Sequence, residues 1–112
     1  MRERIKLLAG RFLQRCSGDV ATLRALLTPM GTSDAKVFDA RVFEELEHLA
    51  HRICGTGASL GFESLSTCAA AIERLAEGQA PMAAVDKEVV RRLVECVAAL
   101  EHEVDRLIHA SV

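Results

Sequence analysis

The chain has 112 residues, a length that fits one domain around a single modest hydrophobic core. Half of its residues are hydrophobic, its only aromatic residues are four phenylalanines, and its net charge is −2. This charge argues against a nucleic-acid interface or an anionic membrane surface, and no apolar run approaches the roughly 18 residues of a membrane span.

Helical periodicity extends along almost the whole chain, and no convincing alternating strand is present. Glycine, proline and serine interrupt the pattern at residues 17–18, 29–34, 61 and 78–81. The pattern predicts helices over residues 2–16, 19–28, 34–58, 63–77 and 84–109. Because short loops favour antiparallel neighbours, we predict one domain, residues 1–112, that is an all-α antiparallel four-helix bundle with a short N-terminal helix or helices.

Each predicted helix has an apolar stripe that we expect to face the core. The first two helices contribute Ile5, Leu8, Phe12, Cys16, Val20, Leu23, Leu26 and Leu27. The last two contribute Leu65, Cys68, Ala69, Ile72, Ala76, Val85, Val89, Leu93, Cys96, Leu100, Val104 and Leu107. Ser33 or Asp34 is a candidate cap for the third helix, and Gly61 is expected to end it in the left-handed region.

The four cysteines, Cys16, Cys54, Cys68 and Cys96, form neither a C-x-x-C pair nor the spacing of a metal knuckle. Three of them fall on apolar stripes, where a thiol behaves as a small hydrophobic side chain. The longest apolar run near the N-terminus, residues 7–9, is too short for the core of a signal peptide. We therefore expect reduced cysteines and a cytoplasmic protein.

On the third predicted helix, His51 is expected to lie opposite the apolar stripe. At about 100° per residue the stripe is about 80° wide, and its centre lies about 180° from His51. The stripe consists of Phe38, Val42, Leu46, Leu49 and Ile53. The residues within about 40° of His51 are Ala40, Glu44, Glu47, Gly55 and Ala58. The sequence therefore predicts a histidine that points away from the core.

The neighbours of His51 suggest a chemical role. Glu47, one turn earlier, could accept a hydrogen bond from the imidazole and leave the other ring nitrogen free as a nucleophile. Gly55, one turn later, costs about 1 kcal/mol of helix propensity relative to alanine. Because Gly55 and Ala58 are expected on the outer face, we interpret them as making room for a docked partner. An exposed imidazole next to a helix surface without bulky side chains is what we expect of a protein that carries a phosphoryl group on histidine and passes it to a docked partner.

At these residues the sequence resembles the histidine phosphotransfer (HPt) domains of two-component phosphorelays. The matching positions are Ala50, His51, Ile53, Gly55, Gly61, Leu65 and then Ile72-Glu73. The resemblance implies that His51 accepts a phosphoryl group from a receiver-domain aspartate and passes it to another receiver. It implies response-regulator receivers and a hybrid histidine kinase as partners, Mg²⁺ on the receiver, and no cofactor of this chain's own. A monomer is the simplest expectation.

The chain departs from the family pattern at Cys54, where a lysine usually follows the histidine by three residues. Arg52 and Arg74 are the candidate replacement cations. Arg52 lies about 100° round the helix from His51. Arg74 is on the neighbouring helix, and the sequence does not determine whether its side chain points toward His51. The missing lysine supports an alternative function, an HPt-like adaptor that binds receivers or kinases without accepting phosphate. The residues expected to support His51 are Glu47, Arg52, Cys54, Gly55, Ala58, Glu73 and Arg74.

A metal-binding helical bundle is a further alternative. His48, His51 and Cys54 recur every three residues, with Glu44 and Glu47 close by. These three side chains spread over about 120° of the helix, and no matching Glu-x-x-His pair faces them from another helix. No kinase or nucleotide-binding motif is present in the sequence.

Overall fold

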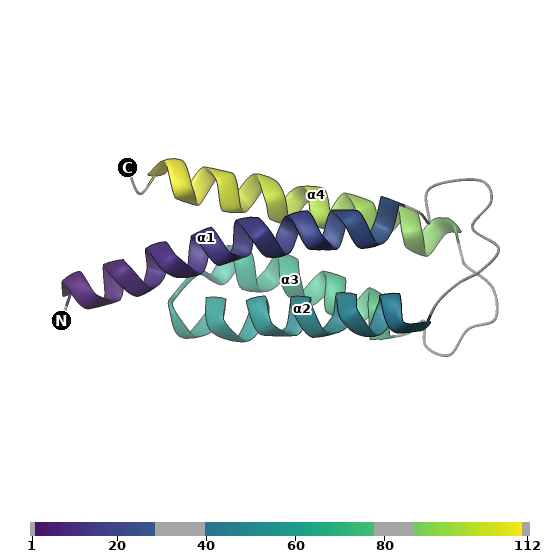
Figure 1. Ribbon diagram of the computed structural model, residues 1–112, viewed down its shortest axis with the longest axis horizontal. Coiled ribbons are helices and arrows are strands. Elements are labelled where there is room, and N and C mark those ends of the chain that lie inside the picture. Colours follow the sequence, from purple (N-terminus) through teal and green to yellow (C-terminus); the bar gives the residue numbers. More distant parts are fainter. Residues whose placement is uncertain (1, 29–39, 78–86, 111–112) are drawn as a thin grey trace.

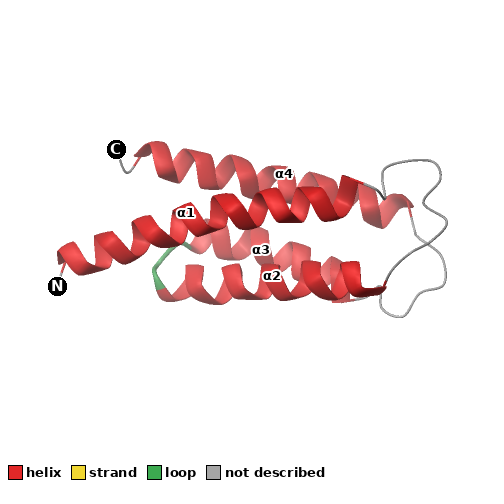
Figure 2. Ribbon diagram, viewed as in Figure 1, coloured by secondary structure: helices red, strands yellow, loops and turns green. Residues whose placement is uncertain are grey.

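The computed structural model describes residues 2–28, 40–77 and 87–110, and these residues form four helices without a strand. The helices are α1 (Arg2–Leu27), α2 (Ala40–Ser59), α3 (Glu63–Glu77) and α4 (Lys87–Ala110). Consecutive helices run antiparallel, as Figure 1 shows, and α1 contacts both α2 and α4. Figure 2 shows the short turn that joins α2 to α3. The predicted all-α four-helix bundle is confirmed.

One continuous helix stands where two N-terminal helices were predicted. The prediction of separate helices over residues 2–16 and 19–28 is wrong, because α1 passes through residues 17–18 without a break. Cys16 and Val20 are both buried, so one apolar face continues across the expected interruption. Gly18 lies on the exposed side, where an added Cβ would meet no atom within 4 Å. Packing of the continuous face outweighs the helix-propensity cost of this glycine, about 1 kcal/mol.

The turn between α2 and α3 is set by Gly61, whose φ is +85°. The N–H of Gly61 donates to the carbonyl of Ala58 at 3.2 Å, and the N–H of Phe62 donates to the carbonyl of Gly57 at 2.8 Å. This pair of bonds is the Schellman arrangement, which ends a helix around a left-handed residue. The prediction for Gly61 is confirmed, and the turn fixes how α3 lies against α2.

The other predicted boundaries lie close to those of the structure where it describes them, with α2 ending at Ser59 and α4 at Ala110 in place of the predicted 58 and 109. Residues 63–77 are helical as predicted. The candidate caps Ser33 and Asp34, the first residues of the predicted helix 34–58 and residues 84–86 of the predicted helix 84–109 lie outside the described residues. None of the described helices is both long and apolar enough to cross a membrane.

The hydrophobic core runs along the axis of the bundle and includes residues from all four helices. The buried side chains are Phe12, Leu13, Cys16, Val20, Leu23, Leu27, Phe43, Leu46, Leu49, Ala50, Ile53, Leu65, Ala69, Ile72, Ala76, Val90, Leu93, Val97, Leu100 and Val104. Aromatic stacking joins α1 to the start of α3, because the rings of Phe12 and Phe62 lie 5.8 Å apart and nearly parallel. Burial raises the pKa of the Cys16 thiol to about 12.

Several predicted core residues lie at the edge of the core instead. The half-buried ones are Leu26, Val42, Cys68, Val89, Cys96 and Leu107. Each helix contacts two neighbouring helices, so the centre of its buried face points between them. On α4 this face includes Val90 and Val97, which are buried. Leu8 is 49% exposed. In Figure 1 the first turns of α1 run past the α2–α3 turn. Phe38, Val85 and the side chain of Ile5 lie outside the described set.

Candidate functional site

His51 lies on the exposed face of α2, and 74% of its side chain is accessible. The residues that anchor α2 beneath it, Leu46, Leu49 and Ile53, are buried as predicted. Ala50, next to His51 in the chain, is also fully buried. The ring is therefore held on a firmly packed helix while its atoms face solvent, which confirms the predicted orientation.

The His51 ring is bonded to a carboxylate from the neighbouring helix. Its Nδ1 lies 2.6 Å from Oε2 of Glu73 on α3. An ionised carboxylate only accepts hydrogen bonds, so Nδ1–H is the donor. The acceptor was predicted to be Glu47, one turn away on α2, but the observed acceptor is Glu73. Across the described residues, Nε2 has no hydrogen-bond partner, and in the neutral ring it keeps its lone pair.

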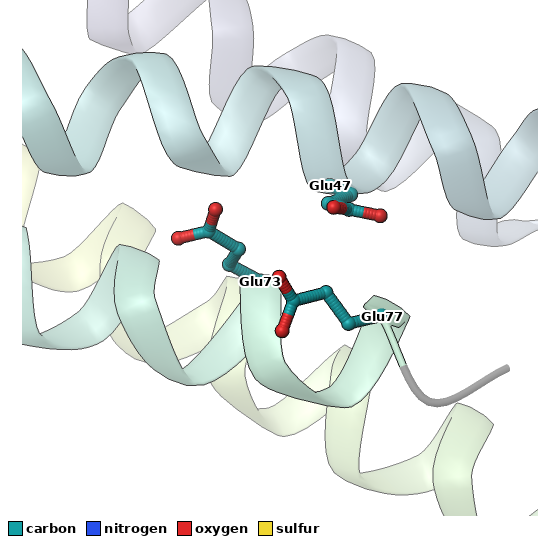
Figure 3. A group of neighbouring side chains, drawn as sticks. All are labelled: Glu47, Glu73 and Glu77. Carbon is teal, nitrogen blue, oxygen red and sulfur yellow. The ribbon is translucent and has the colours of Figure 1, made fainter.

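Carboxylates from two helices line the same pocket as this ring. Three glutamates, Glu47, Glu73 and Glu77, each place one carboxylate oxygen within 4.8 Å of those of the other two. Figure 3 shows Glu47 on α2 and the other two on α3, with their side chains in the space between the helices. They belong to an open pocket of about 420 Å³ lined by Glu44, Glu47, His48, His51, Glu73 and Glu77. No lysine or arginine of the described residues lines this pocket.

The structure brings together a different set of possible metal ligands from the one in the sequence. Among the described residues, the group close enough to share an ion consists of Glu47, Glu73 and Glu77. His48, His51 and Cys54 do not form such a group, because the Cys54 thiol is directed at Ser66 of α3. Exposed carboxylates commonly lie this close without an ion.

Cys54 occupies the interface between α2 and α3. Its Sγ lies 3.3 Å from the Ser66 hydroxyl, which donates to the Cys54 carbonyl at 3.0 Å. Because the hydroxyl proton is used in that bond, the thiol is the donor in the first contact. Cys54 is half-buried, and its contacts with Ser66 link α2 to α3. As a hydrogen-bond donor the thiol is neutral, so it supplies no positive charge in place of the lysine.

Neither of the two candidate cations lines the pocket beside His51. Arg52 turns toward α1, where its Nη2 lies 3.1 Å from Oδ1 of Asp19. Arg74 is exposed on α3 and forms no ion pair with any described residue. To serve as the replacement cation, Arg52 would have to curl back toward His51, but its guanidinium is paired with Asp19 of α1.

The glycines near His51 have different roles. A Cβ added to Gly55 would meet no atom within 4 Å, and Gly55 and Ala58 are both exposed. At Gly57 an added Cβ would lie 3.6 Å from the backbone of Phe62 and Ser66 and 3.7 Å from the ring of Phe12. Gly57 is therefore packed against α1 and the start of α3 at ordinary contact distance, which the sequence did not reveal, whereas position 55 faces open space within the described structure.

Comparison with known proteins gives one match. The family model described as Hpt domain matches residues 8–110. No curated protein and no solved structure matches the chain. The matched range includes His51, all of α2, α3 and α4, and most of α1.

Proposed function

The chain belongs to the Hpt domain family, whose role is histidine phosphotransfer in phosphorelays, and from this premise we propose that His51 is its phosphoryl carrier. It accepts the group from the aspartate of one receiver domain and passes it to another. The observation that carries this proposal is the bond from His51 Nδ1 to Glu73, which assigns the proton of the neutral ring to Nδ1 and leaves the Nε2 lone pair on an exposed helix face.

In the proposed reaction, Nε2 of His51 attacks the phosphorus of a receiver's aspartyl phosphate in line. The new P–N bond forms as the bond from phosphorus to the aspartate oxygen breaks, and the carboxylate stays on the receiver. Nδ1 keeps its proton, and the Glu73 carboxylate stabilises the positive charge that develops on the ring. The receiver's Mg²⁺ neutralises charge on the transferred group. Transfer to the next receiver reverses these steps.

Receiver docking is the second part of the proposal. Gly55 and Ala58 lie on the face of His51 and present little side-chain bulk, so a receiver can bring its phosphorylated aspartate close to Nε2. Response-regulator receivers and a hybrid histidine kinase are the expected partners, and we propose that a cytoplasmic monomer carries out the transfer. The chain itself needs no cofactor for this reaction.

Transfer from a panel of phosphorylated receiver domains tests the proposal. After mixing, intact-mass analysis is expected to show one added phosphoryl group on the wild type and none on His51→Ala. The linkage should be labile in acid and stable in alkali. An equal gain by His51→Ala would contradict the role of this histidine.

Among the residues that the structure describes, none that lines the pocket is a lysine or arginine, and this favours a second candidate function. An adaptor of the same fold would bind receivers without accepting phosphate. The same panel separates the two functions: receiver binding without any mass gain from any donor would support the adaptor. Changing Cys54 to lysine would then be the first substitution to make.

A further inference from the structure

The pocket beside His51 concentrates negative charge from two helices. Four of its six lining residues are glutamates, Glu44 and Glu47 from α2 and Glu73 and Glu77 from α3. A phosphoryl group on Nε2 adds about −1.5 to −2 charges to this surface near neutral pH. Like charges repel, so the pocket raises the free energy of the phosphorylated form.

Among the described residues, no lysine or arginine lines the pocket to offset this repulsion. The nearest arginine in sequence, Arg52, is paired with Asp19. Position 54, where the resemblance leads one to expect a lysine, holds a thiol that is bonded to Ser66. The receiver brings Mg²⁺ only while it is docked, so the repulsion acts fully once the phosphorylated chain is free.

Glu47 and Glu77 differ from Glu73 in what they contact. Glu73 holds the His51 ring, and its loss would change the position of the nucleophile. Glu47 and Glu77 have carboxylate oxygens within 4.8 Å of one on Glu73 but are not the acceptors for Nδ1. Their charge can therefore be removed while the bond that orients the ring stays in place.

We infer that Glu47 and Glu77 set the position of the phosphoryl-transfer equilibrium, shifting it from His51 toward the receiver aspartate. This inference rests on the proposed function of His51. It makes the chain a carrier that releases its phosphoryl group readily to receivers and holds little of it at equilibrium. The two glutamates act through space on the charge of the transferred group, whereas Glu73 acts through its bond to the ring.

The test measures the equilibrium ratio of phosphohistidine to receiver aspartyl phosphate with one receiver at fixed Mg²⁺. The variants are Glu47→Gln, Glu77→Gln and the double substitution, with Glu45→Gln as a matched control. Glu45 is an exposed glutamate of α2 that does not line the pocket. A ratio between the free proteins does not depend on how fast they dock, so it separates charge from interface effects.

Each single substitution in the pocket is expected to raise the ratio by roughly two- to tenfold, and the double substitution by more. Glu45→Gln should leave the ratio at the wild-type value. Pocket variants that keep or lower the wild-type ratio, while His51 is still phosphorylated, would overturn this inference alone. If neither the wild type nor any variant gains a phosphoryl group, the proposed function and this inference both fail.

Discussion

Replacing Gly55 with leucine is expected to slow phosphoryl transfer by roughly 10- to 100-fold, because an added side chain in a packed contact typically costs about 1–3 kcal/mol. The free protein should keep its fold, since a Cβ at this position would meet no atom within 4 Å. It should even gain up to about 0.8 kcal/mol of stability, because leucine favours helix over glycine. Single-turnover transfer from a phosphorylated receiver and denaturant unfolding measure the two effects.

Gly18→Leu is the matched control for this substitution. Gly18 is also an exposed helical glycine whose added Cβ would meet no atom within 4 Å, but it lies on the outer face of α1. The control should gain similar stability and transfer phosphoryl groups at the wild-type rate. If Gly55→Leu also transferred at that rate, Gly55 would not belong to the docking surface.

Replacing Glu73 with alanine is expected to lower the transfer rate on the order of 100-fold, because the ring would lose the bond that fixes its orientation and tautomer. Glu73→Gln should keep much of the rate, since a glutamine amide oxygen can still accept from Nδ1–H. Single-turnover rates with saturating receiver would measure the chemical step for each variant.

Glu63→Ala serves as the control for Glu73, because Glu63 is an exposed glutamate at the start of the same helix and does not line the pocket. It should transfer at the wild-type rate. A Glu73→Gln rate as low as that of Glu73→Ala would show that hydrogen bonding to the ring is not what Glu73 contributes.

The sequence predicts those parts of the site that depend on a single helix. Helical periodicity alone placed His51 opposite the core residues Leu46, Leu49 and Ile53, and the structure agrees. Gly61 could be identified because ending a helix in the left-handed region is a local requirement that glycine meets best. Periodicity and local turn chemistry are both readable from neighbouring residues.

The contacts between helices could not be predicted in the same way. The spacing within α2 pointed to Glu47 as the partner of His51, but the bond comes from Glu73, 22 residues away on α3. Arg52 likewise pairs across 33 residues with Asp19 on α1. Such partners depend on how two helices are rotated against each other, and one sequence does not specify that rotation. The continuous α1 was missed because packing outweighs the local preference of Gly18.

The central claim is that Nε2 of His51 carries the phosphoryl group while Nδ1 stays bonded to Glu73. The most direct test is nitrogen and phosphorus NMR of the phosphorylated protein, which identifies both the residue and the ring atom that is modified. The account predicts a single phosphohistidine, at His51, phosphorylated on Nε2. Phosphorylation on Nδ1, or on another residue, would contradict it.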